Sequence, residues 1–184
     1  MLRPALFLDR DGVINHEVGY LHRPEDVRWV DGIFSLARTA KGLGYKLVVV
    51  TNQSGIAREY YTTAQFEALM TWMGARFVAE GAPLDAVYHC PYHPEHGVGE
   101  WKREHEDRKP SPGMLRRAAR DLALDLGRSV LVGDRCSDVE AANRAGLRQA
   151  FLLEGTETSG CPGDAIQVRS LAEVELWLAQ AFAG

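Results

Sequence analysis

The sequence predicts an α/β protein with a Rossmann-like, doubly wound parallel sheet. Short apolar runs alternate with segments of helical periodicity along the chain, which is typical of strands that alternate with covering helices. Acidic or other polar residues follow directly after several of the apolar runs. No linker rich in proline, glycine or serine divides the 184 residues, so we expect a single domain over residues 1–184.

The first part of the chain is expected to form two strands and one helix. Residues 5–8 are an apolar run that predicts a buried strand, and a longer polar segment follows it. Apolar residues at helical spacing predict a helix over residues 33–43, which Gly44 should end. Residues 46–50 form a nearly continuous apolar run, as expected of a central parallel strand covered on both faces.

The middle of the chain should hold a long helix, a short strand and a loop. Thr62 and Gln65 have the spacing of a capping box, which predicts a helix that runs to about Glu80. A third strand is expected at residues 86–88. The irregular segment at about 89–108 is longer than most connections, which indicates a functional or ion-stabilised loop insertion.

The last part of the chain should complete the alternation. Ser111 as N-cap and Pro112 at the first helical position predict the third helix. Strands are expected at residues 129–132 and 150–153, and a closing helix should be capped at Ser170.

Composition and charge narrow the class of partner. A net charge of −4 argues against a surface for nucleic acid or an anionic membrane, so we expect a small-molecule partner and a monomer. The first residues lack the apolar region of a signal peptide, and no stretch nears the ~20 apolar residues of a membrane span, which favours the cytoplasm. Cys90, Cys136 and Cys161 are an odd number without framework spacing, so we expect a reducing compartment and no thiol mechanism.

Polar side chains follow the first, second and fourth expected strands. Because the carboxyl ends of parallel strands meet at one edge of a sheet, these side chains can converge on one crevice. Each group taken alone is equally a solvated turn or a helix cap, and a lone lysine is usually a surface charge. Taken together they predict a site for a cation or a phosphoryl group, made of Asp9, Asp11, Thr51, Asn52, Lys109, Asp134 and Asp138.

Four of these segments resemble the motifs of the haloacid dehalogenase superfamily of phosphohydrolases. They are Asp9-x-Asp11-Gly12-Val13, Thr51, Lys109 and Gly133-Asp134-x-x-x-Asp138, and the resemblance spans residue 5 to about residue 153. Within the superfamily, residues 9–15, Gly19-Tyr20, 49–58 and 108–114 are similar to the D-glycero-D-manno-heptose 1,7-bisphosphate 7-phosphatase group, of which histidinol-phosphate phosphatases are close relatives. The chain lacks an insertion large enough for a cap domain, so the resemblance implies a capless fold with an open site.

The resemblance implies a role for each residue of the constellation. Asp9 would be the nucleophile that forms an aspartyl phosphate, and Asp11 the general acid and then the general base. Mg²⁺ would be held by Asp9, the Asp11 carbonyl and Asp134, with Asp138 in support. Thr51, Asn52 and Lys109 would stabilise the phosphoryl oxygens. Substrate contacts would come from Glu17, Val18, Gly19, Tyr20, Gln53, Ser54, Arg108 and Arg135, with Arg108 suited to a second phosphate unless it only forms a surface ion pair.

One stretch departs from the pattern of this group. Its members carry a structural zinc loop before the lysine motif, with a Cys-x-His pair followed by a Cys-x-Cys pair, and here only Cys90 stands in place. A Zn²⁺ site could still be assembled, with Cys90 and His105 as its first ligands and His93, His96 and Asp107 available. We favour a degenerate site without Zn²⁺, because structural zinc loops normally use several thiolates.

Three functions are consistent with the sequence. The leading hypothesis is a magnesium-dependent phosphatase that removes the C7 phosphate of heptose 1,7-bisphosphate for cell-surface polysaccharide synthesis. The second is a phosphatase for histidinol phosphate or another small monoester. The third is a receiver-like module, which combines an acidic pocket, a threonine and a lysine on a similar sheet without hydrolysing small phosphates.

Overall fold

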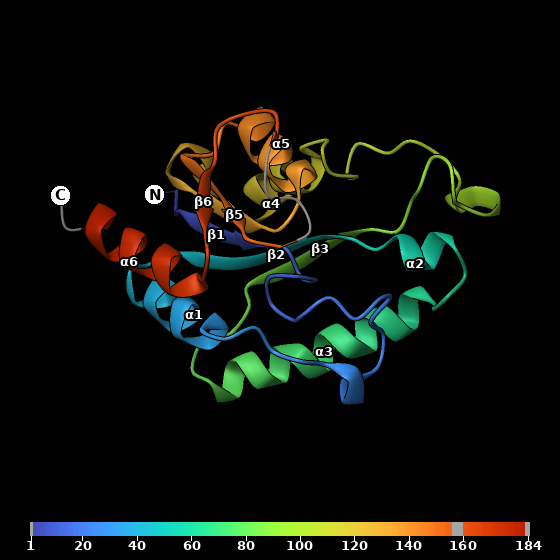
Figure 1. Cartoon of the computed structure of the whole chain (residues 1–184), viewed down its shortest axis with the longest axis horizontal. Helices are drawn as coiled ribbons and strands as arrows, with labels where there is room; N and C mark the ends of the chain where they lie inside the picture. The colour runs from blue at the N-terminus through green and yellow to red at the C-terminus, as the bar shows by residue number, and fades with distance from the viewer. Residues whose placement is uncertain (1, 156–159, 183–184) are drawn as a thin grey trace.

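A six-stranded parallel sheet forms the centre of the protein in a computed structural model, which describes residues 2–155 and 160–182. The strand order is β3-β2-β1-β4-β5-β6, the order of a doubly wound sheet whose direction of winding reverses between β1 and β4 (Figure 1). The predicted fold class is therefore confirmed. The strands are β1 Ala5–Leu8, β2 Lys46–Asn52, β3 Ala86–Cys90, β4 Val130–Gly133, β5 Gln149–Leu153 and β6 Ile166–Val168.

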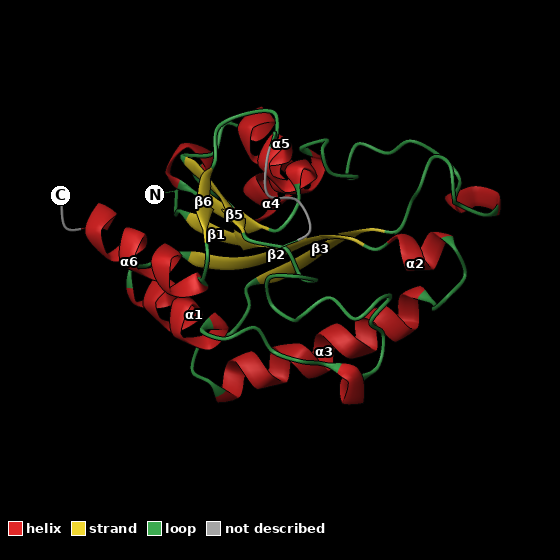
Figure 2. Cartoon of the chain, viewed as in Figure 1, coloured by secondary structure: helices red, strands yellow, loops and turns green. Residues whose placement is uncertain are grey.

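Helices cover both faces of this sheet (Figures 1 and 2). α1, α3 and α6 pack on one face, whereas α4 and α5 pack on the other. None of the helices among the described residues combines the length and the apolar character needed to cross a membrane. The helices are α1 Ile33–Gly42, α2 Ser54–Ala57, α3 Thr63–Ala79, α4 Gly113–Leu122, α5 Cys136–Ala145 and α6 Leu171–Phe182.

β1 is the hydrophobic centre because successive side chains of a strand point to opposite faces. Leu6 and Leu8 join the apolar cluster beneath α1, α3 and α6, and Ala5 and Phe7 join the cluster beneath α4 and α5. All four side chains are fully buried, and Phe7 lies level with Val48 of β2 and Leu131 of β4. A strand fixed this firmly holds the residues that follow it, from Asp9 onward, in a defined place.

Most of the local sequence signals are confirmed. Thr62 and Gln65 form the predicted reciprocal capping box at the start of α3. Gly44 follows the end of α1 with a φ of +83°, the left-handed conformation that glycine adopts without steric cost. The closing helix begins directly after Ser170, although the Glu173 carboxylate accepts from the backbone N–H of Arg169.

Three elements differ from the predictions. Ser111 is not the N-cap of α4, because its N–H closes a turn onto the carbonyl of Arg108 and Pro112 takes the cap position instead. β6 was missed because two of its three residues are exposed, which removes the apolar signal. The four-residue α2 is too short to show a periodic pattern.

The expectation that all three cysteines are reduced is also corrected. Cys136 and Cys161 form a disulfide, and Cys90 is free and buried. The two partners meet because the chain after β5 returns alongside α5, where the Asn143 side chain hydrogen-bonds both the N–H and the carbonyl of Asp164. A sequence separation of 25 residues gives no local sign of this return.

Candidate active site

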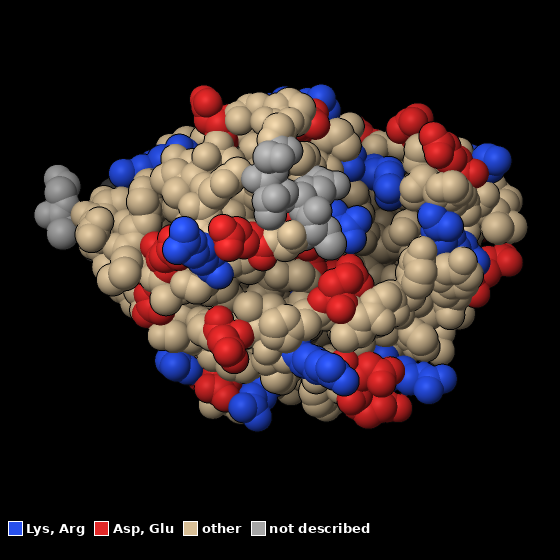
Figure 3. Space-filling model, in the orientation of Figure 1, with Lys and Arg blue, Asp and Glu red and all other residues tan. Residues whose placement is uncertain are grey.

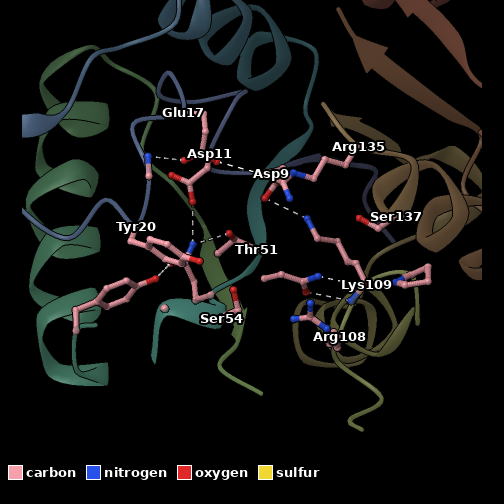
Figure 4. A pocket seen from close by; sticks show the side chains of 16 residues that line it. Asp9, Asp11, Glu17, Tyr20, Thr51, Ser54, Arg108, Lys109, Arg135 and Ser137 are labelled. Atoms are coloured by element: carbon pink, nitrogen blue, oxygen red, sulfur yellow. Dashed lines mark hydrogen bonds and ion pairs between the residues drawn. The ribbon is translucent and has the colours of Figure 1, made fainter. Parts of the chain in front are cut away.

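A cavity of about 580 Å³ opens at the carboxyl ends of the central strands. It lies at the reversal of the strand order, where open α/β sheets bind their ligands. Figure 4 shows Asp11, Glu17 and Tyr20 on one side, Arg135 and Ser137 on the other, and Asp9 between them. Of the predicted residues, the lining includes Asp9, Asp11, Glu17, Gly19, Tyr20, Thr51, Asn52, Gln53, Ser54, Arg108, Lys109 and Arg135.

Three carboxylates converge beside this cavity, and Asp9 is the one that lines it. Asp9 follows β1, and Asp134 and Asp138 lie at the end of β4 and in the first turn of α5; one oxygen of each lies within 4.8 Å of the others. No other group of three or more His, Cys, Asp or Glu side chains in the described part of the chain converges in this way. The sequence thus places a concentrated negative charge at the end of two adjacent strands.

Lys109 is the cation buried against this cluster. Its ammonium lies 3.1 Å from Oδ1 of Asp9, donates to the carboxylate of Asp138 and donates to the Val50 carbonyl over 2.9 Å. Burial opposes the charge on Lys109, but Asp138 and Asp9 outweigh it and raise the Lys109 pKa above its ordinary value. Both carboxylate oxygens of Asp138 have hydrogen-bond partners, because the second oxygen accepts from the N–H of Arg135 over 3.1 Å.

One lysine does not neutralise the cluster. Burial raises the pKa of Asp9 to about 7, against the opposing effect of Lys109 and together with the charges of Asp138 and Asp134. Burial and Asp138 likewise raise the pKa of Asp134 to about 6. Oδ1 of Asp134 is buried, and among the described residues it has no hydrogen-bond partner. An unpartnered oxygen beside ionisable oxygens of Asp9 is the donor set that suits a hard divalent cation.

Asp11 faces a different set of partners. Nη2 of Arg10 lies 2.8 Å from Oδ2 of Asp11, Asn15 donates to Oδ1 over 3.0 Å, and Gln53 donates to Oδ2 over 3.1 Å. Arg10 is fully buried and lies over the ring of Phe66, 5.6 Å from its centroid. Arg10 was not predicted as a site residue, although a cation between two aspartates after an apolar strand was a usable signal. Asp9 and Asp11 therefore have different environments within one cavity.

Asn52 has a function that the sequence did not indicate. Its Oδ1 accepts from the backbone N–H of Lys109, and its Nδ2 donates to the Lys109 carbonyl, both over 3.0 Å. This reciprocal pair fixes the backbone of Lys109 to the end of β2. The lysine is therefore held by its main chain as well as by its ammonium group.

The outer part of the cavity carries the remaining predicted residues. Arg135 reaches Oε2 of Glu17 over 3.4 Å, which brings the loop after β1 to the start of α5. The half-buried Arg108 donates to the Tyr92 carbonyl over 3.0 Å, so it is more than a surface ion pair. Val18 is 39% exposed and is the one predicted side chain of this loop that does not line the cavity.

The predicted zinc ligands lie with separate partners. Cys90 is part of the apolar cluster beneath α4 and α5, and burial raises its pKa to about 11. Nδ1 of His93 accepts from the N–H groups of Glu95 and His96. Asp107 pairs with Arg117 over 2.7 Å. Each of these side chains is thus engaged in holding the protein fold.

In the loop that follows β3, three side chains pack against Tyr92. The His105 ring stacks on Tyr92 with centroids 4.5 Å apart, the Arg103 guanidinium lies 4.1 Å from the Tyr92 centroid, and the Trp101 ring lies 5.5 Å away. Stacked rings and a cation over a ring stabilise by dispersion and electrostatics. These contacts join the two arms of the loop that follows β3.

Replacing Tyr92 by leucine is expected to destabilise this loop. The variant loses the ring contacts with His105 and Arg103, which should lower the free energy of unfolding by about 2 kcal/mol. The measurement is urea unfolding together with limited proteolysis, and the loop should be cleaved first. Val78→Ala is the control, because Val78 is 62% exposed on α3. Equal proteolysis of the variant and the wild type would contradict the role of Tyr92.

Gly133 is required by close packing at the end of β4. A Cβ at this position would lie 2.2 Å from the Cβ of Asp138, a distance that real side chains do not adopt. Gly133→Ala should therefore displace Asp138 from Lys109, lower the stability by about 2 kcal/mol and reduce activity strongly. Gly42→Ala in α1 is the matched control, because a Cβ there meets nothing within 4 Å, and it should leave both properties unchanged or raise stability. Thermal unfolding and phosphate release check both variants.

The strand order, the aspartates after β1, the threonine after β2, the buried lysine and the acidic pair at β4 define a haloacid-dehalogenase-like phosphatase. The family model described as "HAD-hyrolase-like" matches residues 107–172. A D-glycero-alpha-D-manno-heptose-1,7-bisphosphate 7-phosphatase from Burkholderia mallei is 50% identical over 172 residues, which cover 94% of this chain and 87% of the relative. A D-glycero-beta-D-manno-heptose-1,7-bisphosphate 7-phosphatase from Vibrio cholerae is 44% identical over 153 residues, 83% of this chain and 82% of the relative.

Solved structures agree with these relatives. A putative HAD-like phosphatase from Mesorhizobium loti has a TM-score of 0.88 and 42% identity, and the match covers 99% of this chain and 87% of that one. D,D-heptose 1,7-bisphosphate phosphatase from B. bronchiseptica, complexed with magnesium and phosphate, has a TM-score of 0.83 and 30% identity, with 97% and 99% covered. The chain belongs to the family of the D-glycero-D-manno-heptose-1,7-bisphosphate 7-phosphatases. The resemblance inferred from the motifs is confirmed, and the protein is a phosphatase and not a receiver-like module.

Proposed function

We propose that this enzyme uses Mg²⁺ to remove the C7 phosphate of D-glycero-D-manno-heptose 1,7-bisphosphate. The observation that carries the proposal is that Asp134 and Lys109 both converge on Asp9, where Asp9 and Lys109 line an open cavity. The family membership supports the substrate, because the curated relatives are named for this reaction. The Mg²⁺ is supported by the unpartnered oxygen of Asp134 and by the metal in the B. bronchiseptica structure.

We assign the chemistry to the side chains as the resemblance of their motifs implies. An oxygen of Asp9 attacks phosphorus, the bond from phosphorus to the C7 oxygen breaks, and Asp11 gives that oxygen a proton. Water then attacks the aspartyl phosphate, Asp11 takes its proton, and phosphate leaves Asp9. Bound Mg²⁺, held by Asp9, Asp134 and the Asp11 carbonyl, would reduce the repulsion between two anions. Lys109 and Thr51 stabilise the charge on the phosphoryl oxygens, and Asp138 keeps Lys109 in place.

The outer cavity suits the rest of a sugar bisphosphate. We assign Arg108 to the second phosphate, because its guanidinium lines the cavity and can form a bidentate pair. Gly19, Tyr20, Ser54 and Arg135 line the same space and would contact the sugar. Acidic and basic side chains are interspersed over the face shown in Figure 3. The positive charges that would attract an anionic substrate are therefore those of Arg108, Lys109 and Arg135, which line the cavity.

Three further properties belong to this proposal. The whole chain acts as one phosphatase domain and works as a monomer in the cytoplasm. The loop after β3 holds no Zn²⁺, since Tyr92 and its neighbours occupy its centre. Metal analysis of protein purified without added metal tests the last point, and one zinc per chain would contradict it.

Phosphate release from a panel of substrates tests the substrate assignment. The panel contains both anomers of heptose 1,7-bisphosphate, histidinol phosphate and p-nitrophenyl phosphate, each with Mg²⁺ and with a chelator. We expect the bisphosphate to give the highest kcat/KM and the chelator to abolish turnover. The ratio of kcat/KM for the two anomers shows whether the enzyme prefers the alpha anomer, for which the Burkholderia relative is named, or the beta anomer, for which the Vibrio relative is named. Preference for histidinol phosphate would contradict the proposal.

A further inference from the structure

A buried tyrosine that the sequence did not indicate lines the cavity and reaches the catalytic side chains through one glutamine. Tyr61 lies between α2 and α3, and only 4% of it is exposed. Its hydroxyl donates a hydrogen bond to Oε1 of Gln53. Nε2 of Gln53 donates in turn to Oγ1 of Thr51 over 2.8 Å and to Oδ2 of Asp11 over 3.1 Å, and Figure 4 shows these ends of the network.

Tyr61 and Asp11 together hold the Gln53 amide in one orientation. The oxygen and nitrogen of a glutamine amide have nearly the same shape, so the hydrogen-bond partners select the orientation. Burial raises the pKa of the Tyr61 hydroxyl, which therefore keeps its proton and donates it to the buried Oε1. An ionised carboxylate only accepts, so the nitrogen of Gln53 faces Asp11 and Thr51, and Tyr61 gives the buried Oε1 its donor.

This orientation matters for Thr51, whose hydroxyl has one proton to donate. Its oxygen accepts from Gln53, so its own O–H is left for a group in the cavity. With the amide reversed, Oε1 of Gln53 would accept the Thr51 proton and withdraw it from the cavity. By giving the buried Oε1 its donor, Tyr61 thus helps to keep the Thr51 O–H available to a phosphoryl oxygen.

The ring of Tyr61 is itself held firmly. It stacks on His22 with ring centroids 5.4 Å apart. On another side it lies against α2, where a Cβ at Gly55 would be 2.2 Å from Cε1 of Tyr61. Only glycine leaves room for the ring at this point. A rigid ring aims its hydroxyl at a fixed place, as a positioning residue requires.

We propose that Tyr61 is a positioning residue of the phosphatase reaction, which fixes Gln53 so that the Thr51 hydroxyl is available to the phosphoryl group. The inference rests on the proposed function only in taking Thr51 as a ligand of that group. It adds to the set of residues that determine the rate one that acts through Gln53.

Tyr61→Phe tests the proposal, because it removes the hydroxyl and keeps the ring. We expect kcat to fall about tenfold or more with little change in KM, since the Thr51 hydrogen bond strengthens in the transition state. Tyr45→Phe is the matched control, because Tyr45 is 5% exposed and precedes the opposite end of β2. This control should keep the wild-type kcat, and the melting temperatures of both variants are measured alongside.

A double-mutant cycle separates positioning from a general structural effect. Gln53→Met removes the amide at similar size, so Tyr61→Phe should have no further effect on kcat in that background. An equal fall in kcat in both backgrounds, or an unchanged kcat in Tyr61→Phe alone, would overturn the proposal. The assay uses p-nitrophenyl phosphate as well as the heptose bisphosphate. Failure of the wild type on the sugar would therefore contradict the proposed function and leave this test intact.

Discussion

Replacing Asp9 by asparagine is expected to reduce kcat by about 10⁴-fold or more, because the amide cannot form the aspartyl phosphate. The fold should remain, since the change is nearly isosteric. Burial raises the pKa of Asp9 to about 7, so its ionised form is less favourable in the folded than in the unfolded state. Removing that charge should leave the melting temperature at pH 8 unchanged or higher.

Phosphate release and thermal unfolding together check this result. Asp26→Asn, at an exposed position before α1, is the control and should keep full activity. An Asp9→Asn enzyme with a near-normal rate would exclude Asp9 as the nucleophile. An unfolded variant would contradict the view that the Asp9 charge costs stability.

Replacing Lys109 by methionine should have the second largest effect, on both stability and rate. Methionine fills similar space but leaves Asp138 buried without a counter-ion, which costs about 3–5 kcal/mol. The unpaired carboxylates should take up protons more readily in the folded than in the unfolded state. The loss of stability relative to the wild type should therefore shrink as the pH falls below 7.

A second substitution identifies the cause of this loss. Asp138→Asn in the Lys109→Met background removes the unpaired charge and should recover part of the stability, without recovering the rate. Lys102→Met at an exposed position is the control for the loss of a positive charge. Urea unfolding at several pH values measures these effects. A loss that neither low pH nor Asp138→Asn relieves would show that packing, and not charge, is what Lys109 provides.

The sequence was sufficient for the fold class and for the centre of the site. Asp9 and Asp134 each follow an apolar run, and the carboxyl ends of parallel strands share one edge, so their approach could be predicted. Lys109 could be placed only through its motif, because no periodicity connects it to Asp9. The capping box at Thr62 was predictable because it depends on residues close in sequence.

The missed features depend on contacts between distant segments. The Cys136–Cys161 disulfide is set by how the chain returns alongside α5 after β5, which no local pattern encodes. The contacts of Tyr92 were not predicted, because aromatic residues in a polar segment gave no sign of their partners. Asn52 was expected to hold a phosphoryl oxygen, and its bonds to Lys109 emerged only from the structure.

The central claim is that Asp9 and Asp134 share one divalent cation at the floor of the cavity. The most direct measurement is anomalous diffraction from crystals of the wild-type enzyme in which Mn²⁺ takes the place of Mg²⁺. We expect one strong anomalous peak between the carboxylates of Asp9 and Asp134, and its loss in Asp134→Asn. An active enzyme with no peak at this position, or with a peak that Asp134→Asn leaves unchanged, would contradict the account.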